Sequence, residues 1–181
     1  MLAKSASAAV KHIRKSQEAF SSLPEVYLHP GQSHVAGSPT VLKMILGSCA
    51  GVFLLDPVLG IAGATHYMLP RHQPGQPSPR YGDIALSSLL GKFLELGSSR
   101  RNIQAKVFGG ASIVVALRDA HTNHIGHVGA RNVDIALEML AEASISVVNK
   151  NILGTRGRKV SMASDTGEIT LEFVSSADGY R

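Results

Sequence analysis

Cys49 and His66 are the residues whose types and spacing most clearly point to chemistry. Cys49 is the only cysteine of the chain and follows Gly47-Ser48 between two apolar segments. His66 lies 17 residues later, in a third apolar segment. Small residues before a thiol let the backbone turn tightly and let a substrate approach the sulfur and its backbone N–H. A thiol beside an imidazole can form a thiolate–imidazolium pair, the nucleophile of thiol hydrolases. An isolated cysteine can equally be a small buried hydrophobe, and that alternative stays open.

A β-hairpin would bring these two side chains together. The apolar runs 50–55 and 61–68 flank residues 56–60, a turn sequence in which an aspartate bonds the local backbone and a proline fixes φ. A turn centred early in that linker pairs residues whose numbers sum to about 115, which is the sum for Cys49 and His66. Directly opposed β carbons lie ~4.5–5.5 Å apart, so we predict that the imidazole can reach the sulfur.

Two further groups of residues are weaker candidates. His121, His124 and His127 have the three-residue spacing that can place ligands on one helix face, but Gly126 favours a loop of exposed histidines over a metal site. The segment 108–111 contains two glycines but lacks the lysine of a phosphate-binding loop. We therefore predict neither a metal nor a cofactor.

Composition bounds the class of protein. The chain has 181 residues, 44% of them apolar and 17% charged, so it can bury a core. One cysteine excludes an internal disulfide and a multi-thiolate zinc site. The most apolar run, 44–55, is shorter than the ~20 residues that a membrane-spanning helix needs, and the first 20 residues lack the continuous apolar stretch of a secretory signal. We expect a cytoplasmic protein without membrane insertion.

The net charge of +5 is dispersed along the chain in short clusters. Aromatic residues are not interleaved with these clusters in the pattern that stacks on nucleic-acid bases. A solvated basic face is therefore the preferred interpretation, and we predict no nucleic-acid partner.

The chain divides into an N-terminal arm and one domain. Residues 1–23 are rich in Ala, Ser and basic residues and predict a flexible arm, whereas 24–181 predict a single domain. Residues 29–39 and 70–79 hold several prolines and glycines and predict loops, the second a candidate to gate a neighbouring site.

Two helices and several strands are expected within the domain. Apolar stripes of helical period predict helices over 83–96, with Asp83 as N-cap and Gly97 as C-terminal stop, and over 130–142. Apolar runs predict strands over 41–46, 50–55, 61–68, 104–108, 144–148, 158–162 and 168–174. Because these elements do not alternate as βαβ units, an α+β fold is favoured over a doubly wound sheet.

The chain also resembles the chemoreceptor glutamine deamidases of bacterial chemotaxis, the CheD family. The likeness runs in order from about residue 24 to residue 174. It is carried by seven short segments: Tyr27-Leu28-His29-Pro30-Gly31; Leu46-Gly47-Ser48-Cys49 with Asp56-Pro57; Thr65-His66-Tyr67-Met68-Leu69-Pro70; Arg80-Tyr81-Gly82-Asp83; Ala105-Lys106-Val107-Phe108-Gly109-Gly110-Ala111; Ile125-Gly126 with Arg131-Asn132-Val133; and Gly157-Arg158-Lys159-Val160.

The resemblance implies a specific activity and fold. Family members hydrolyse side-chain amides of receptor glutamines to glutamate without a cofactor, and the family's catalytic Cys and His fall on Cys49 and His66. The substrate would be the cytoplasmic domain of a chemoreceptor. The fold implied is an α/β/β three-layer sandwich. Some members also bind a phosphatase, CheC.

The oxyanion of the reaction would be stabilised by backbone N–H groups around Gly47, Ser48 and Cys49, together with the Gly109-Gly110 loop. Specificity would come from the surface around the site, with the loop from Arg71 to Arg80 as the candidate. A transglutaminase-like enzyme or another Cys–His amidase shares this chemistry and stays an alternative.

The sequence departs from the family at two places. The family's orienting Thr, six residues before the Cys, is replaced here by Lys43, and the acidic stretch before the final Gly-Arg becomes 149–154, Asn-Lys-Asn-Ile-Leu-Gly. The alternative function is therefore a weakly active or inactive member that acts as a binding module for a CheC-type phosphatase or a receptor.

Overall fold

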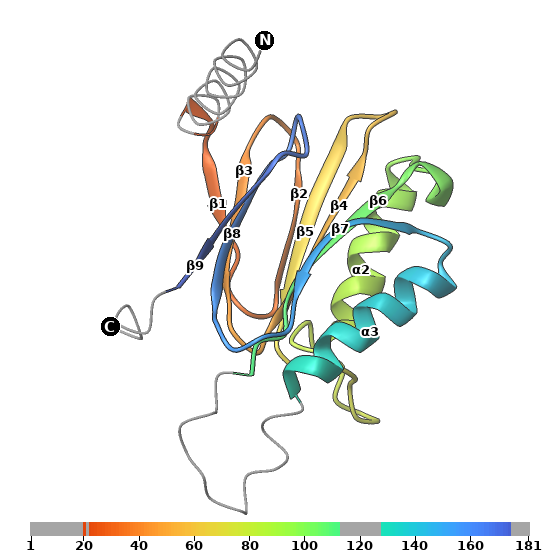
Figure 1. Cartoon of the computed structure of the whole chain (residues 1–181). Helices are drawn as coiled ribbons and strands as arrows, with labels where there is room; N and C mark the ends of the chain where they lie inside the picture. The colour runs from red at the N-terminus through yellow and green to blue at the C-terminus, as the bar shows by residue number, and fades with distance from the viewer. Residues whose placement is uncertain (1–19, 21, 113–127, 175–181) are drawn as a thin grey trace, which may run out of the picture.

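The computed structural model describes residues 20, 22–112 and 128–174. Within these ranges the chain forms nine strands, two α-helices and one short 3-10 helix (Figure 1). The strands are β1 (Glu25–Tyr27), β2 (Gln32–Ala36), β3 (Val41–Leu46), β4 (Ala50–Asp56), β5 (Ile61–Tyr67), β6 (Gln104–Gly109), β7 (Ser146–Ile152), β8 (Arg158–Ala163) and β9 (Ile169–Phe173). The helices are α2 (Gly82–Glu95), η1 (Arg100–Asn102) and α3 (Val128–Glu142).

The strands form two sheets that are stacked with the helices in three layers. One sheet has the order β1-β3-β8-β9, and the other has the order β2-β5-β4-β6-β7. Helices α2 and α3 cover one face of the five-stranded sheet, and the four-stranded sheet covers its other face (Figure 1). The predicted α+β class and α/β/β sandwich are confirmed.

Two cores hold the layers together, and β4 contributes to both. Val52 and Leu54 face the helices, where they pack with Leu86, Leu89 and Phe93 of α2. Burying one such side chain stabilises the fold by about 1.5–3 kcal/mol relative to exposure. Alternate residues of a strand point to opposite faces, so a strand covered on both sides needs an unbroken apolar run, as β4 has.

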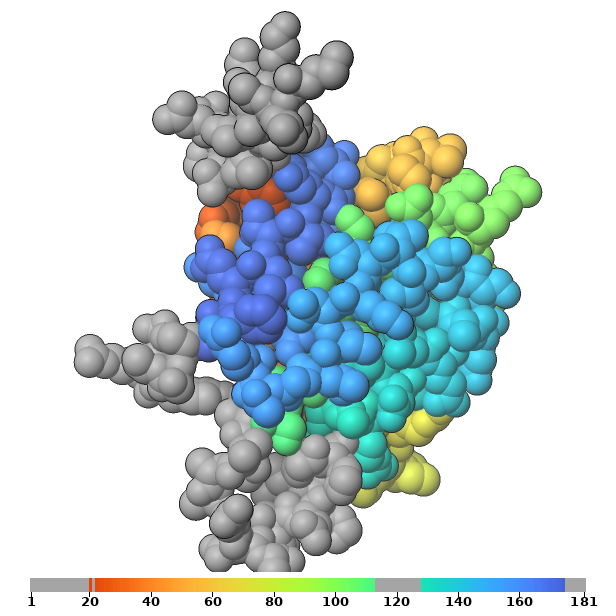
Figure 2. Space-filling model, in the orientation of Figure 1, coloured from red at the N-terminus to blue at the C-terminus, as the bar shows by residue number. Residues whose placement is uncertain are grey.

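The second core lies between the sheets. Phe53 and Phe108 meet edge to face with ring centroids 5.8 Å apart, and Leu42, Met44 and Val160 reach them from the four-stranded sheet. Cys49, in the segment that precedes β4, packs against this core, so the core helps to fix its position. In Figure 2, β9, β7 and α3 lie side by side on the visible face, which shows the layers from their edge.

The predicted elements are largely confirmed, with three differences. The range 29–39, predicted as loop, contains β2, an edge strand paired antiparallel with β5. The strand predicted over 144–148 lies later, as β7. Asp83 is not the N-cap: α2 begins at Gly82, the cap position is Tyr81 without a side-chain hydrogen bond, and Asp83 bonds the preceding loop. Gly97 does end the helix, at a φ of +92°.

Some predictions fall outside the described residues. His121, His124 and His127 lie there, as does almost all of the arm predicted over 1–23. The division into arm and domain therefore stays a prediction. Among the described residues, no helix is long and apolar enough to cross a membrane.

Candidate active site

The segment 47–49 joins β3 to β4, and hydrogen bonds hold each of its three carbonyl oxygens. Gly110 N–H donates to the Cys49 carbonyl at 2.8 Å, and Ala111 N–H donates to the Gly47 carbonyl at 2.8 Å. The side-chain amide of Asn132 donates to the Ser48 carbonyl at 2.9 Å. No backbone carbonyl among the described residues accepts the N–H of Ser48 or Cys49. The hydrogen bonds to these three carbonyls thus fix the segment in place. The N–H groups of Ser48 and Cys49, beside the thiol, stay available to an incoming oxygen.

Gly109 and Gly110 have a supporting role in this arrangement. Both have positive φ, +106° and +71°, which glycine adopts without a Cβ penalty. A Cβ on Gly109 would overlap the carbonyl oxygen of Cys49, and one on Gly110 would lie 2.7 Å from the Gly129 carbonyl. The N–H of Gly110, predicted as an oxyanion donor, is already engaged by Cys49. These glycines let β6 and α3 approach the segment that carries Cys49.

His66 is buried in β5, with only 2% of its surface exposed. Its Nδ1 lies 2.9 Å from the carbonyl oxygen of Leu28. Because a carbonyl only accepts, Nδ1 carries the proton, and Nε2 of the neutral ring has a free lone pair. Nε2 is buried and has no hydrogen-bond partner among the described residues. A fixed ring with an unpartnered basic nitrogen is suited to take a proton.

Cys49 and His66 lie on the same face of the five-stranded sheet. His66 follows Ala62 and Ala64 on the face between the sheets, and Cys49 packs against the same inter-sheet core. The predicted direct opposition is wrong, since His66 is paired with Gly51. Cys49 is therefore diagonal to His66, a position at which β carbons are ~7–8 Å apart or somewhat less. No hydrogen bond joins Sγ to Nε2 in the part of the chain that the structure describes.

The error in register has a physical cause. The hairpin turn is centred later than predicted, because the last pair of the ladder is Asp56 with Ile61. The Asp56 carboxylate accepts hydrogen bonds from the N–H groups of Val58, at 2.9 Å, and Leu59, at 3.2 Å. The carboxylate therefore stabilises a four-residue turn, and every pair along the ladder moves with it.

Burial disfavours the charged forms of both Cys49 and His66. Burial raises the pKa of the Cys49 thiol, and the Cys49 backbone N–H opposes this with a smaller effect. Burial lowers the pKa of His66; its bond to Leu28 opposes the shift, and the charge of His29 adds to it. A thiol with a raised pKa beside an imidazole with a lowered pKa is a neutral pair rather than a preformed ion pair.

Lys43 lies on the other side of the four-stranded sheet. Its ammonium pairs with Glu25, while its neighbours in β3, Leu42 and Met44, point into the inter-sheet core. Since alternate strand residues face opposite sides, Lys43 points away from Cys49. Lys43, which stands where the resemblance implies an orienting Thr, therefore supplies no group to the candidate site. The described residues also hold no group of three or more His, Cys, Asp or Glu side chains that could bind a metal.

Asn132 is the site residue to which sequence analysis assigned no role. It is fully buried in the first part of α3, and its Nδ2 donates to the carbonyls of both Ser48 and Met68 at 2.9 Å. Tyr67 donates its hydroxyl to the Asn132 carbonyl at 2.6 Å. Asn132 thus ties the start of β4 to the end of β5. One feature of the sequence could have indicated a role for Asn132: it is a polar residue four positions before Ala136, so it lies on the apolar stripe of the helix.

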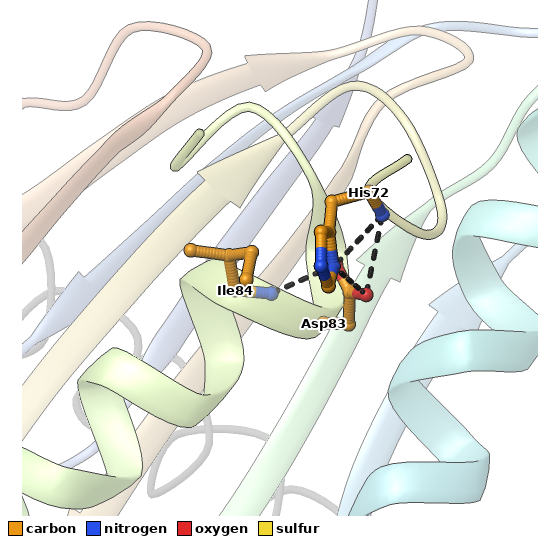
Figure 3. A network of polar contacts seen from close by, with 3 residues as sticks. All are labelled: His72, Asp83 and Ile84. Carbon is orange, nitrogen blue, oxygen red and sulfur yellow. Dashed lines mark hydrogen bonds and ion pairs between the residues drawn. The ribbon is translucent and has the colours of Figure 1, made fainter. Parts of the chain in front are cut away.

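A loop of residues 70–80 borders the same end of the sheet. His72 bonds Asp83 through its ring Nδ1 at 2.8 Å and through its backbone N–H, as Figure 3 shows. Burial raises the pKa of Asp83, but the hydrogen bonds from His72 and Ile84 outweigh it, so the pKa is lowered overall. Arg71 pairs with Glu138 of α3 at 2.7 Å. These two side-chain contacts tie the loop to both helices.

Comparison with known proteins places the chain in a family. The family model described as "CheD chemotactic sensory transduction" matches residues 68–173. A relative from Anaeromyxobacter dehalogenans, "Probable chemoreceptor glutamine deamidase CheD 1", is 41% identical over 143 residues, which is 79% of this chain and 81% of the relative. The chain belongs to the CheD family.

Other CheD proteins are similarly close. The relative from Sulfurimonas denitrificans is 39% identical over 84% of this chain and 96% of its own length, and one from Geobacter sulfurreducens is 39% identical over 86% and 94%. Both are named probable chemoreceptor glutamine deamidases. Among solved structures, the Bacillus licheniformis hypothetical protein YfiH aligns with a TM-score of 0.46 and 13% identity over 68% of this chain and 51% of its own.

The matched range of the CheD model begins after His66. Family membership therefore rests on the helices, the loop 70–80 and the later strands, together with the longer alignments to whole relatives.

Proposed function

We propose that this CheD protein is a chemoreceptor glutamine deamidase in which Cys49 is the nucleophile and His66 the general base. The observation that carries the proposal is the state of His66: its ring is fixed by the Leu28 carbonyl, and its bare Nε2 is buried on the face that Cys49 shares. The names of the relatives support glutamine side chains of chemoreceptors as the substrate.

In the first half of the reaction, an acyl group moves to sulfur. Nε2 of His66 accepts the thiol proton as Sγ of Cys49 attacks the carboxamide carbon. The negative oxygen that forms is stabilised by the N–H groups of Ser48 and Cys49. The C–N bond then breaks, and the imidazolium of His66 gives its proton to the departing nitrogen, which leaves as ammonia. A thioester between the substrate and Cys49 remains.

In the second half, water releases the product. His66, neutral again, takes a proton from water as the oxygen attacks the thioester carbon. The C–S bond breaks, the proton returns to Sγ, and a glutamate side chain leaves. Cys49, His66 and water account for every proton and electron pair in these steps. Catalytic hydrogen bonds are often long before substrate binds, so the absence of a bond between Sγ and Nε2 at rest is compatible with this sequence.

The test is peptide mass spectrometry of a chemoreceptor cytoplasmic fragment after incubation with the protein. We expect particular glutamines to gain the mass of glutamate, with rates lower by on the order of 10⁴-fold for Cys49→Ala and His66→Ala. His34→Gln is the matched control, because His34 is a histidine of β2 outside the site. Unchanged rates in the Cys49→Ala protein would overturn the proposal.

A second candidate function is a binding module for a receptor or a CheC-type phosphatase. The observation that favours it is Lys43, which faces away from Cys49 and leaves the site without the orienting group that the family resemblance implies. No glutamine conversion, with slow alkylation of Cys49 in both wild type and His66→Ala, would support this function in place of the deamidase.

A further inference from the structure

Arg158 is a buried cation between the two sheets. It is the first residue of β8, and only 1% of its surface is exposed. Val160 and Met162, which share its side of the strand, lie in the core between the sheets, so the Arg158 side chain faces that core as well. A guanidinium stays charged in proteins, and burying it costs free energy unless its N–H groups are hydrogen-bonded. Its presence here therefore needs a reason beyond packing.

The hydrogen-bond partners of Arg158 among the described residues are backbone carbonyls of one short stretch, residues 151–156. Its Nη1 donates to the Asn151 carbonyl, and its Nη2 donates to the carbonyls of Leu153 and, at 3.3 Å, Arg156. No carboxylate of a described residue pairs with it. These contacts cross from the four-stranded sheet to the end of β7 in the five-stranded sheet. Arg158 therefore fixes the connection between β7 and β8 and does not neutralise an acid.

This connection contains a residue in a strained conformation. Leu153 has a φ of +62°, which is uncommon for a residue with a Cβ, and Gly154 follows at +78°. Such a conformation persists only where the surroundings determine it. The Leu153 side chain is exposed, so packing does not hold it. Its backbone does: Arg158 bonds the carbonyl, and the Gly109 carbonyl accepts the N–H at 2.8 Å.

The backbone of Leu153 is connected to Cys49 through Gly109 and Gly110. The N–H of Leu153 donates to the Gly109 carbonyl, and the next N–H along the chain, that of Gly110, donates to the Cys49 carbonyl at 2.8 Å. Figure 1 shows the connection between β7 and β8 at the end of the sheets where β6 ends. Arg158 is thus linked to the proposed nucleophile by a short series of hydrogen bonds.

A second series of bonds runs beside the first. The N–H of Ser112 donates to the Gly154 carbonyl at 2.8 Å, and the N–H of Ala111, the residue before it, donates to the Gly47 carbonyl. The stretch that Arg158 holds therefore supports both ends of the segment 47–49.

We propose that Arg158 is a positioning residue for the reaction: by holding residues 151–156, it keeps the backbone of Gly109 and Gly110, and with it Cys49, in place for attack. This inference rests on the proposed deamidase function and adds a residue that acts through other groups and not on the substrate. The property required is the planar fork of the guanidinium, which offers several N–H groups in fixed directions. A lysine would keep the charge and lose the fork.

The experiment compares variants of two buried cations that connect the sheets at opposite ends. Arg158→Lys keeps the charge, and Arg158→Met removes charge and fork together. The matched control is Lys106→Met, because the ammonium of Lys106 in β6 donates to the carbonyl of Gly167, in the turn between β8 and β9. For each variant, kcat and KM are measured with a receptor cytoplasmic fragment, and chemical denaturation measures stability.

We expect kcat of Arg158→Lys to fall by roughly ten-fold or more with KM unchanged, since a nucleophile misplaced by about 1 Å can lose on the order of 100-fold in rate. Lys106→Met should keep the wild-type kcat even where it loses as much stability. If Arg158→Met fails to fold, Arg158→Lys still decides. A wild-type kcat in Arg158→Lys, or an equal fall in Lys106→Met at equal stability, would overturn the inference.

Amide hydrogen exchange separates this inference from the deamidase function. In Arg158→Lys, the N–H groups of Gly110 and Ala111 should exchange roughly ten-fold faster relative to the amides of the β4–β5 ladder in the same protein. In Lys106→Met this ratio should match wild type. Such a result supports the inference even where wild type converts no glutamine, an outcome that would refute only the deamidase. An unchanged ratio in Arg158→Lys would overturn the inference even in an active enzyme.

Discussion

The segment that carries Cys49 and the loop of residues 70–80 lie at the same end of the five-stranded sheet, but different forces hold them. The three carbonyls of the first are bonded by backbone and side-chain N–H groups from β6, α3 and the residues between them. Gly109, Gly110 and Asn132 in that shell are all buried. Neutral, buried hydrogen bonds are barely affected by salt, and each contributes about 0.5–1.5 kcal/mol net. This segment is therefore built to stay in place.

The loop of residues 70–80 has backbone hydrogen bonds at its two ends, and between them side-chain contacts near the surface tie it to the helices. The side chains of Arg71 and Glu138 are about half exposed, at 57% and 49%, which places their pair among those worth ~0–1 kcal/mol. The two regions at this end of the sheet therefore differ in how firmly they are held. The segment of Cys49, the proposed nucleophile, is fixed by buried neutral hydrogen bonds, whereas the side-chain contacts of the neighbouring loop are weak enough for it to shift.

The largest difference between the two regions is expected when one methyl group is added to each of them. Gly109→Ala should destabilise the fold by about 3–5 kcal/mol, because φ is +106° and the new Cβ overlaps the Cys49 carbonyl. Gly75→Ala, in the loop, has a φ of +81° but open space around it, so about 1–2 kcal/mol is expected. Thermal unfolding of both variants measures the difference, and equal shifts would contradict it.

Replacing one side chain in each region tests the same difference in how firmly the regions are held. Asn132→Ala deletes two hydrogen bonds and leaves two part-buried carbonyls without their donor, so we expect a loss of roughly 1–3 kcal/mol. If Asn132 positions the thiol, kcat falls by about ten-fold or more while KM changes little. The matched change in the loop, Glu138→Gln, should cost less than ~1 kcal/mol and leave kcat unchanged. Chemical denaturation and steady-state kinetics check both, and a kcat for Asn132→Ala equal to wild type would exclude the positioning role.

Local pattern accounts for much of the fold. The apolar run of β4 and the stripes of α2 and α3 gave their elements correctly, because each follows the period of its own structure and is buried accordingly. β2 could not be found in this way. Its sequence, QSHVA, lacks a strong alternation, and it is a strand because it pairs with the edge of β5. Such pairing is a property of the assembled sheet.

In the candidate site, too, some features could be predicted from local sequence and others depend on the assembled fold. The sequence placed Cys49 and His66 at adjoining ends of one hairpin and on one face, and the structure agrees. Their register depends on where the turn closes, which the Asp56 carboxylate decides. The role of Asn132 depends on a contact 84 residues away along the chain, between α3 and Ser48. No local pattern encodes such a contact, although a polar residue on a buried stripe hints that one exists.

The two regions should also differ in their response to pH. His66 is buried and its pKa is lowered, so the unfolded chain, with a histidine pKa near 6.5, binds this proton more readily than the folded chain. The stability from His66 is therefore complete above about pH 6.5 and is lost as the pH falls below it. The lowered pKa of Asp83 acts only below about pH 4, and the raised pKa of Cys49 only above about pH 8.5, so neither interferes between pH 7.5 and 5.

Thermal unfolding across that range measures the effect of His66. Wild type should lose stability on acidification, and His66→Gln, which keeps a donor for the Leu28 carbonyl, should lose less. His72→Gln, a substitution of the partly exposed histidine in the loop, should retain the wild-type slope from His66. In activity, kcat/KM should hold its plateau at pH 6.5 and fall only at lower pH, because the base stays neutral there. Parallel slopes for wild type and His66→Gln would show that burial does not set the protonation of this ring, and would remove the neutral pair on which the mechanism depends.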